Sequence, residues 1–242
     1  MDIQWLTAPH PSTLGPADLH LWLIPGGPGD DHDGGEVDDS PVERARLSAL
    51  WPLLSPPERE RATRLRLARH RHAYLRAHAG LRLILARYLG QAPERIRLTP
   101  GPQGKPAVTG DLEFNLTTSG DLALVAVRRD QPVGVDCERI TPHRDMIAIA
   151  QRLFAAGEIE QLQACDLEER PQLFTRFWTG LEARVKFTGR GLFHPPLTRT
   201  VEPDIQHFIP QPGYLAAIAS PDLPPLPAWR THRLSLPGPA SG

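Results

Sequence analysis

The chain has little cysteine, little net charge and no long apolar run, and each shortage argues against a class of protein. Two cysteines, Cys137 and Cys165, are too few for the disulfide framework of a small secreted domain. A net charge of −1 argues against a general nucleic-acid coat. No apolar run reaches the ~18 residues that span a bilayer, and the first residues lack the basic start of a secretory signal. We therefore expect a soluble, reduced, cytoplasmic protein that binds neither membrane nor nucleic acid.

Proline, by contrast, is abundant. The 27 prolines are roughly twice the average frequency, so many connections should be extended. The length of 242 residues allows one large domain or two small ones. Residues 25–43 are rich in glycine and aspartate and cannot bury apolar surface, so we expect a flexible acidic insert there.

A long basic helical region is predicted from residue 55 onward. Ser55 is a good N-cap, prolines follow it, and Glu58 completes a capping box. The helical pattern continues to about Leu89 with one break near residues 70–72, and Gly90 suits a C-cap. The region carries nine arginines against two glutamates. Most of these arginines fit a solvated helix face, yet the excess also suits a polyanionic ligand or an acidic partner.

Two segments of the chain resemble each other. Residues 120–127 read G-D-L-A-L-V-A-V and residues 213–220 read G-Y-L-A-A-I-A-S, with glycine, leucine and two alanines in register. Each follows a long helical region. We interpret the similarity as modest support for an α+β fold made of two similar, pseudo-twofold halves. The first half would span 1–131 and the second 132–242.

A pair of acids opens the second half. In the stretch G-V-D-C-E, a strand would place Asp136 and Glu138 on one face, about 7 Å apart. A helix predicted over residues 171–187 carries Glu182 and, one turn later, Lys186. Three carboxylates suit Mg²⁺, which prefers oxygen ligands. The alternative for the helical pair is an ordinary ion pair worth ~0.2–0.5 kcal/mol.

Two stretches of the first half offer groups for an anion. The glycine-rich turn G-P-Q-G-K-P ends near Lys105, although the Walker spacing is absent. The stretch F-N-L-T-T-S-G carries Thr117 and Thr118. Hydroxyls beside glycine bring oxygens and N–H groups close to a phosphate, or they simply form a turn. Together with the acids, these groups imply a metal-bridged pyrophosphate substrate.

The combined motifs resemble the Sfp-type 4′-phosphopantetheinyl transferases. That family has a G-[IV]-D-x-E strand and a W-[ST]-x-K-E-[AS]-x-x-K helix, which match G-V-D-C-E and W-T-G-L-E-A-R-V-K in this chain. The upstream stretches L-S-P-P-E, G-K-P and N-L-T-T-S-G-D follow in the family's order. The resemblance covers roughly residues 47 to 220.

The resemblance implies a monomer that binds coenzyme A between its halves and modifies an acyl or peptidyl carrier protein. Asp136, Glu138 and Glu182 would hold Mg²⁺, or alternatively Mn²⁺. Glu182 would take the proton of the carrier serine, and Lys186 would stabilise the leaving charge. The cofactor-binding residues that it implies are Lys105, Thr117, Thr118, Arg71, Arg76 and Lys186.

Three positions depart from the family pattern. Thr117 and Thr118 stand where Ser-His is usual, Leu181 stands where a lysine is expected, and His78 replaces a common arginine. Each lost charged contact to a phosphate would cost ~1.5–3 kcal/mol of binding free energy. Because the metal and acid–base residues are present, we expect a divergent active transferase. The alternatives are a catalytically impaired homologue that binds coenzyme A or a carrier protein, and a basic-helix module that binds an acidic protein or RNA.

Overall fold

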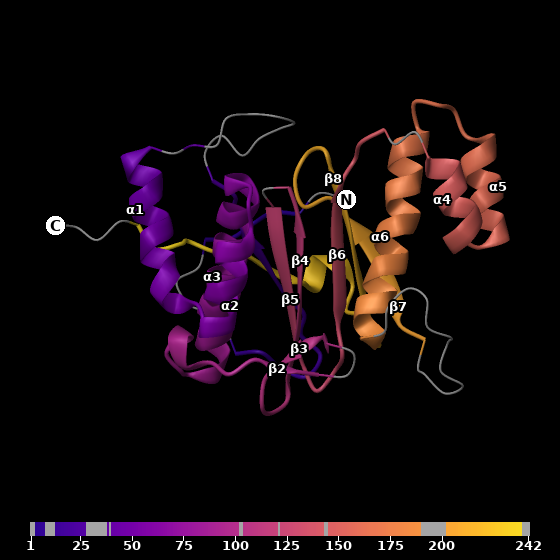
Figure 1. Cartoon of the computed structure of the whole chain (residues 1–242). Coiled ribbons are helices and arrows are strands. Elements are labelled where there is room, and N and C mark those ends of the chain that lie inside the picture. Colours follow the sequence, from indigo (N-terminus) through magenta and orange to yellow (C-terminus); the bar gives the residue numbers. More distant parts are fainter. Residues whose placement is uncertain are drawn as a thin grey trace.

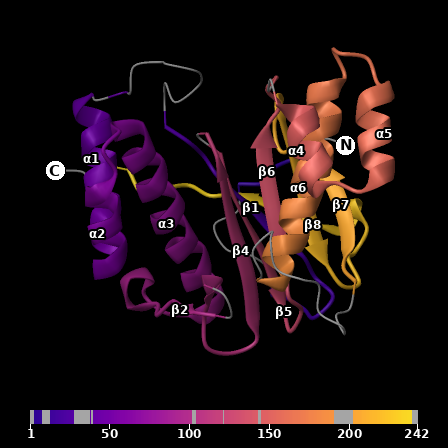
Figure 2. The same ribbon diagram turned by 45° about the vertical axis from the view of Figure 1, so that its right-hand side comes forward.

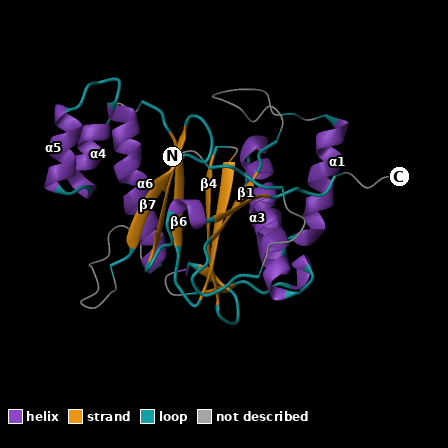
Figure 3. Cartoon of the chain, turned by 180° about the vertical axis from the view of Figure 1, so that it is seen from behind, coloured by secondary structure: helices purple, strands orange, loops and turns teal. Residues whose placement is uncertain are grey.

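The structure, a computed structural model, describes residues 3–7, 13–27, 38, 40–101, 104–120, 122–142, 145–189 and 202–238. The two larger sheets stand side by side between two groups of helices (Figure 1). A third, two-stranded sheet is formed by β2 (Thr99–Pro100) and β3 (Pro106–Ala107). The first group comprises α1 (Pro41–Leu50), α2 (Pro56–Arg64) and α3 (Ala68–Leu89). The second comprises α4 (Met146–Leu153), α5 (Ala156–Ala164) and α6 (Arg170–Thr188). The same arrangement is seen from behind in Figure 3, with the strands between the helical groups.

The first sheet has the strand order β4-β5-β1-β9. Its strands are β1 (His20–Ile24), β4 (Leu112–Ser119), β5 (Leu122–Arg129) and β9 (Arg230–Arg233). β1 pairs antiparallel with β5 and parallel with β9. Side chains on β1 and β5 alternate between two cores, as the strand period of two requires. One core includes Trp22 and Ile84 of α3, and the other includes Leu21 and Ile218 of the second sheet.

The second sheet has the order β6-β8-β7, with β6 (Gly134–Arg139), β7 (Asp204–Phe208) and β8 (Tyr214–Ser220). Helix α6 runs along β6 (Figure 2) and contributes Ala183 and Phe187 to a small core with β8. The helix approaches so closely that a Cβ on Gly134 would lie 2.0 Å from the carbonyl oxygen of Ala183. The absence of a side chain at Gly134 therefore allows α6 to pack directly against β6.

The structure confirms the predicted helix signals and corrects one boundary. The amide of Ser55 donates to Glu58 Oε2 at 2.8 Å, which forms half of the capping box. Gly90 ends α3 with a φ of 61°. The predicted break near residues 70–72 is wrong, because the chain leaves the helix after Arg64 and re-enters it at Ala68. The guanidinium of Arg71 donates to the carbonyl of Leu65 within this break, at 3.2 Å, and so partners a carbonyl beyond the end of α2.

The two similar segments form β5 and β8, and each is an inner strand of its sheet. Each begins after a glycine with positive φ, 58° at Gly120 and 81° at Gly213, because a left-handed turn precedes both strands. The α+β class is confirmed. The pseudo-twofold relation and the division at residue 131 stay predictions, and β9 joins the first sheet from beyond that division.

Other predictions have mixed outcomes. A turn was one interpretation of the hydroxyl-rich stretch before Gly120, and it is wrong because Leu112–Ser119 forms a full strand. Residues 41–43 of the expected flexible insert are the first turn of α1, whereas 28–37 and 39 lie outside the described residues. Among the helices of the described chain, none is long and apolar enough to cross a bilayer.

Candidate functional site

The candidate site lies at the seam where β4 of the first sheet meets β6 of the second. Alternate side chains of β4 hydrogen-bond across this seam. Asn115 Oδ1 accepts from the amide of Val135 at 2.8 Å, and Ser119 Oγ accepts from the amide of Arg139 at 3.1 Å. The same face of β6 carries the two predicted acids. The seam therefore sets hydroxyls beside carboxylates.

Asp136 is the most enclosed acid of the site, with 3% of its surface exposed. Its Oδ1 accepts from Lys186 Nζ at 2.5 Å and from Thr117 Oγ1 at 3.1 Å. Its Oδ2 is buried and has no hydrogen-bond partner among the described residues. A buried carboxylate oxygen without a partner is costly. This atom therefore favours a ligand that the protein alone does not supply.

The other two acids are electrostatically coupled to Asp136. Burial raises the pKa of Glu138, and the charge of Asp136 raises it further. Burial and Asp136, in the same order, raise the pKa of Glu182 on α6, while Lys186 opposes both shifts. Glu138 Oε2 accepts from Ser119 Oγ at 2.9 Å. The structure thus places Glu138 and Glu182 within electrostatic range of the Asp136–Lys186 pair.

The donor set fits a hard divalent cation without forming a closed cage for one. Within the described ranges, no three His, Cys, Asp or Glu side chains are grouped tightly enough to count as a ready metal site. The ammonium of Lys186 instead partners Asp136, so it balances negative charge in this form. Carboxylate oxygens are nevertheless the ligands that Mg²⁺ prefers, and the buried Asp136 Oδ2 needs a partner.

Side-chain alternation separates the site residues from their sequence neighbours. Cys137 faces the core between the sheets and is 1% exposed. Burial raises the pKa of its thiol, and the charges of Asp136 and Glu138 add to the effect. It is therefore unsuited to act as a nucleophile, in agreement with the absence of any role for it in the sequence prediction. Thr118, on the opposite face of β4 from Thr117, is exposed.

Unlike Lys186, the predicted cofactor-binding residues Lys105, Arg71 and Arg76 bond to groups other than the three site acids. Lys105 donates to the carbonyl of Val133, just before β6, at 2.9 Å, and burial lowers its pKa. Arg71 donates to a backbone carbonyl in the break between α2 and α3. Arg76 is buried and its Nη2 lies 2.5 Å from Glu43 Oε1 of α1, at a separate cavity of about 330 Å³. Contacts of these residues with a cofactor stay predictions.

A larger cavity of about 1210 Å³ opens between α2, α3 and β4, and it reaches the seam at Asn115. Sequence reasoning missed the cavity, although the arginine excess indicated its charge. Tyr74 and His78 stack there with ring centroids 3.9 Å apart, and the Arg61 guanidinium lies over the Tyr74 ring. The basic side chains that line the cavity are Arg59, Arg61, His78, Arg82, Arg95 and Arg97.

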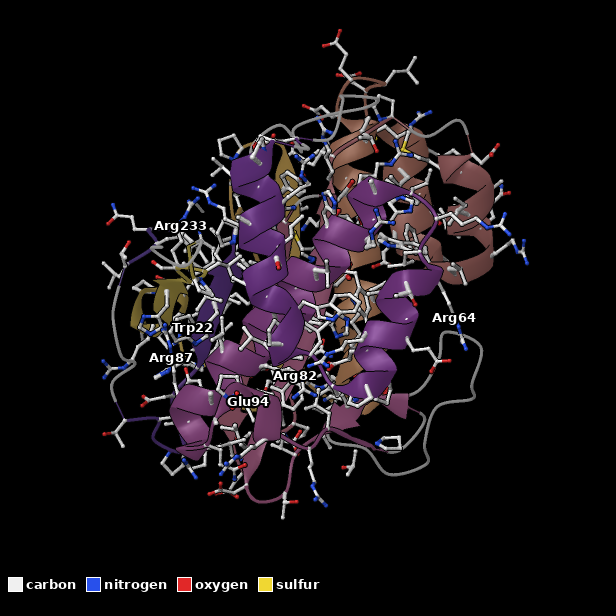
Figure 4. The ribbon with its side chains drawn as sticks, turned by 60° about the vertical axis from the view of Figure 1, so that its left-hand side comes forward. Trp22, Arg64, Arg82, Arg87, Glu94 and Arg233 are labelled. Atoms are coloured by element: carbon white, nitrogen blue, oxygen red, sulfur yellow. The ribbon has the colours of Figure 1, made fainter. Side chains whose placement is uncertain are left out.

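The arginines of the basic region have different surroundings. Figure 4 shows Arg82 beneath the helices and Arg64 reaching outward. The Arg82 side chain is 2% exposed and its Nε donates to Glu58 Oε2 at 2.7 Å. Burial alone would raise the pKa of Glu58, but hydrogen bonds from His78 and Ser55 and the charge of Arg82 lower it to about 2. One acid within the basic cavity is thereby neutralised by its neighbours.

Comparisons with known proteins show the family to which the chain belongs. Residues 132–211 match the family model described as the 4′-phosphopantetheinyl transferase superfamily. The transferase HetI of Nostoc sp. is 34% identical over 194 residues, which are 78% of this chain and 76% of HetI. Sfp of Bacillus subtilis is 28% identical over 207 residues, or 77% of this chain and 91% of Sfp. A Synechocystis sp. protein, provisionally named as such a transferase, is 34% identical over 157 residues, which span only 63% of its length.

Proposed function

Because this chain belongs to the 4′-phosphopantetheinyl transferase family, we propose that it transfers the 4′-phosphopantetheine arm of coenzyme A to a serine of an acyl or peptidyl carrier protein. The observation that carries the proposal is the buried Asp136, whose Oδ2 has no partner in the described chain while Lys186 and Thr117 hold its Oδ1. An acid in this state suits a metal ion that neutralises a pyrophosphate.

The large cavity would take the nucleotide end of coenzyme A. It has the volume for a nucleotide, a basic lining and an aromatic ring stack, and it opens onto the seam. A smaller cavity of about 350 Å³ is lined by Glu138, Phe174 and Trp178. A substrate that extended from the large cavity at Asn115 to this smaller one would come close to Glu138. The pyrophosphate lies between the two ends of coenzyme A, which suits this arrangement.

The chemistry divides among the residues of the seam. Asp136, Glu138 and Glu182 would hold a divalent cation, Mg²⁺ or Mn²⁺. When bound, the cation would neutralise pyrophosphate charge that the low-dielectric site would otherwise disfavour. Glu182 would accept the hydroxyl proton of the carrier serine as the serine oxygen forms a bond to the β-phosphorus of coenzyme A. The bond from that phosphorus to adenosine 3′,5′-bisphosphate breaks, and Lys186 would stabilise the negative charge that leaves.

The departures from the family pattern bear on the strength of binding. Thr118 is exposed on the face away from the acids and lacks the imidazole usual at that position. His78 lies in the basic cavity and its Nδ1 lies 3.3 Å from Glu58 Oε1, so an imidazole is present from another element. We propose that the missing contacts weaken coenzyme A binding without removing the acid–base machinery. A cytoplasmic monomer made of two halves remains part of the same proposal.

Mass spectrometry of an apo carrier protein tests the function. With coenzyme A and Mg²⁺, the carrier should gain about 340 Da, the mass of the transferred arm in this phosphoryl displacement. Glu182→Gln should reduce transfer by at least 100-fold, as expected for loss of a general base that is also a proposed metal ligand, while the unfolding curve stays unchanged. Glu160→Gln, an exposed acid of α5, is the matched control.

The outcomes separate the hypotheses. Coenzyme A binding without transfer to any of several carriers would indicate the impaired homologue. Absence of coenzyme A binding would refute the transferase and the impaired homologue together. Full activity of Glu182→Gln would remove our assignment of the base.

A further inference from the structure

We infer that Thr117 and Ser119 are positioning residues, which fix the two carboxylates of β6 in the orientation that a divalent cation requires. This inference rests on the proposed function and goes beyond it, because the sequence motifs assign no role to Ser119 and would direct Thr117 to a phosphate. Both side chains lie on the same face of β4, two residues apart, and both are buried. Each reaches one acid across the seam.

Ser119 accepts one hydrogen bond and donates another, and its hydroxyl proton points to Glu138. The backbone amide of Arg139 is a donor only and points at Ser119 Oγ from 3.1 Å. Because that contact uses a lone pair, the hydroxyl proton is directed at Glu138 Oε2, 2.9 Å away. The Glu138 carboxylate, which accepts this hydrogen bond, is held through one of its two oxygens. Its other oxygen, Oε1, is the one that Ser119 leaves for another partner.

Thr117 repeats the arrangement with a side-chain donor in place of the amide. The ammonium of Lys186 has no acceptor capacity and lies 3.1 Å from Thr117 Oγ1. The threonine proton is therefore directed at Asp136 Oδ1, also at 3.1 Å. The opposite oxygen, Oδ2, is the buried atom without a described partner. Both hydroxyls thus engage one oxygen of an acid and leave the other.

The spacing of the two strands makes the pairing regular. Thr117 lies 19 residues before Asp136, and Ser119 lies 19 residues before Glu138. β4 and β6 therefore run in the same direction at the seam, and their two-residue periods coincide. A T-x-S on one strand is matched to a D-x-E on the other. Partners that orient metal ligands typically change metal affinity by 10–100-fold when they are removed.

Binding of Mn²⁺ to the full chain, followed by electron paramagnetic resonance with and without coenzyme A, tests the inference apart from catalysis. Ser119→Ala should weaken Mn²⁺ binding by about tenfold or more, and Thr117→Val, which keeps the side-chain shape, should do the same. Thr117→Ser keeps the hydroxyl and should bind Mn²⁺ with an affinity within about threefold of wild type. Carrier modification at saturating Mn²⁺ should recover in Ser119→Ala, since its defect lies in metal affinity.

A matched control tests whether loss of any buried hydroxyl has the same effect. Thr179 on α6 is fully buried and its hydroxyl bonds to the carbonyl of Arg176 within the helix, at 3.2 Å. Thr179→Val should lose stability without changing Mn²⁺ affinity. Urea unfolding of every variant identifies any that fails to fold, and the Ser119 and Thr117 variants then serve as independent arms.

Each result bears on a different statement. Wild-type protein that binds Mn²⁺ and transfers the arm, together with variants of unchanged Mn²⁺ affinity, would overturn the positioning role alone. Equal weakening in Thr179→Val would overturn it too, since the effect would then be structural. Wild-type protein that binds no Mn²⁺, even with coenzyme A, would remove both the inference and the metal-dependent function.

Discussion

Acid should destabilise this protein at a mildly acidic pH because His20 is buried in a neutral form. His20 has no exposed surface, and its Nδ1 lies 2.8 Å from the hydroxyl of Tyr88. That hydroxyl also accepts from the indole N–H of Trp22 at 2.7 Å. Its own proton then goes to His20 Nδ1, which leaves the ring proton on Nε2, a buried atom without a described partner. Figure 4 shows Arg87 beside Trp22, so the positive charge of this guanidinium is close to the cluster of His20, Tyr88 and Trp22.

The magnitude follows from the pKa of His20. Burial lowers this pKa from 6.5 to about 4, the neighbouring His232 and Arg230 lower it too, and Asp18 opposes them. Between pH 6.5 and 4 the unfolded chain binds a proton that the folded chain refuses, so the free energy of unfolding falls as the pH falls. The interval corresponds to at most about 3 kcal/mol at 1.36 kcal/mol per pKa unit. Burial also lowers the pKa of His232, which acts in the same direction.

Urea unfolding followed by tryptophan fluorescence between pH 7.5 and 4 measures this loss. We expect His20→Asn to be less stable than wild type at pH 7.5, because the bond with Tyr88 is weakened. The difference should shrink by about 2–3 kcal/mol by pH 4, since the variant has no imidazole to protonate. His70→Asn, on the exposed face of α3, is the control and should follow the wild-type curve. Parallel curves for wild type and His20→Asn would refute the reasoning.

Three further predictions, two on packing and one on buried hydrogen bonds, are measured by urea unfolding at neutral pH. Gly134→Ala should cost about 3 kcal/mol or more and reduce transfer, because its Cβ would lie 2.0 Å from the backbone oxygen of Ala183; wild-type stability would contradict the close approach of α6. Gly180→Ala meets His207 Nε2 at a milder 3.1 Å and regains helix propensity, so it should change stability by less than about 1 kcal/mol. Arg128→Met should cost about 2–4 kcal/mol, since the buried guanidinium donates to a hydroxyl and two backbone carbonyls beyond β8, and a cost below 1 kcal/mol would show that these bonds add little.

Much of the fold follows from local patterns in the sequence. The cap at Ser55 and the left-handed glycine at position 90 each depend on residues close together in the chain, so they were predictable. Helix α4 was missed, although its eight residues carry an amphipathic pattern that buries Met146 and Ala150.

The candidate site was predictable in its residue types and less so in their partners. Lys186 contacts Asp136, and Glu138 and Glu182 lie within electrostatic range of that pair, whereas the metal and catalytic roles of these residues stay predictions. Nothing in the spacing indicated that Lys186 would neutralise Asp136, since that contact depends on how closely α6 packs on β6. The roles of the arginines likewise depend on tertiary contacts. Arg82 is a buried ion-pair partner rather than part of a solvated face, because α2 folds back onto α3 and brings Glu58 to it.

The parallel pairing of β9 with β1 has a consequence for how the chain reaches its native state. β1 forms near residue 20, yet its neighbour on one side arrives only with residues 230–233. During synthesis the first sheet would expose an open edge at β1 until residues 230–233 have left the ribosome, and contacts so distant in sequence slow folding. Leu6 also bridges to His232, so the earliest and latest described segments close the same edge. β9 therefore covers the edge of β1 in the first sheet, and a chain shortened before residue 230 would be prone to aggregate through the exposed edge of β1.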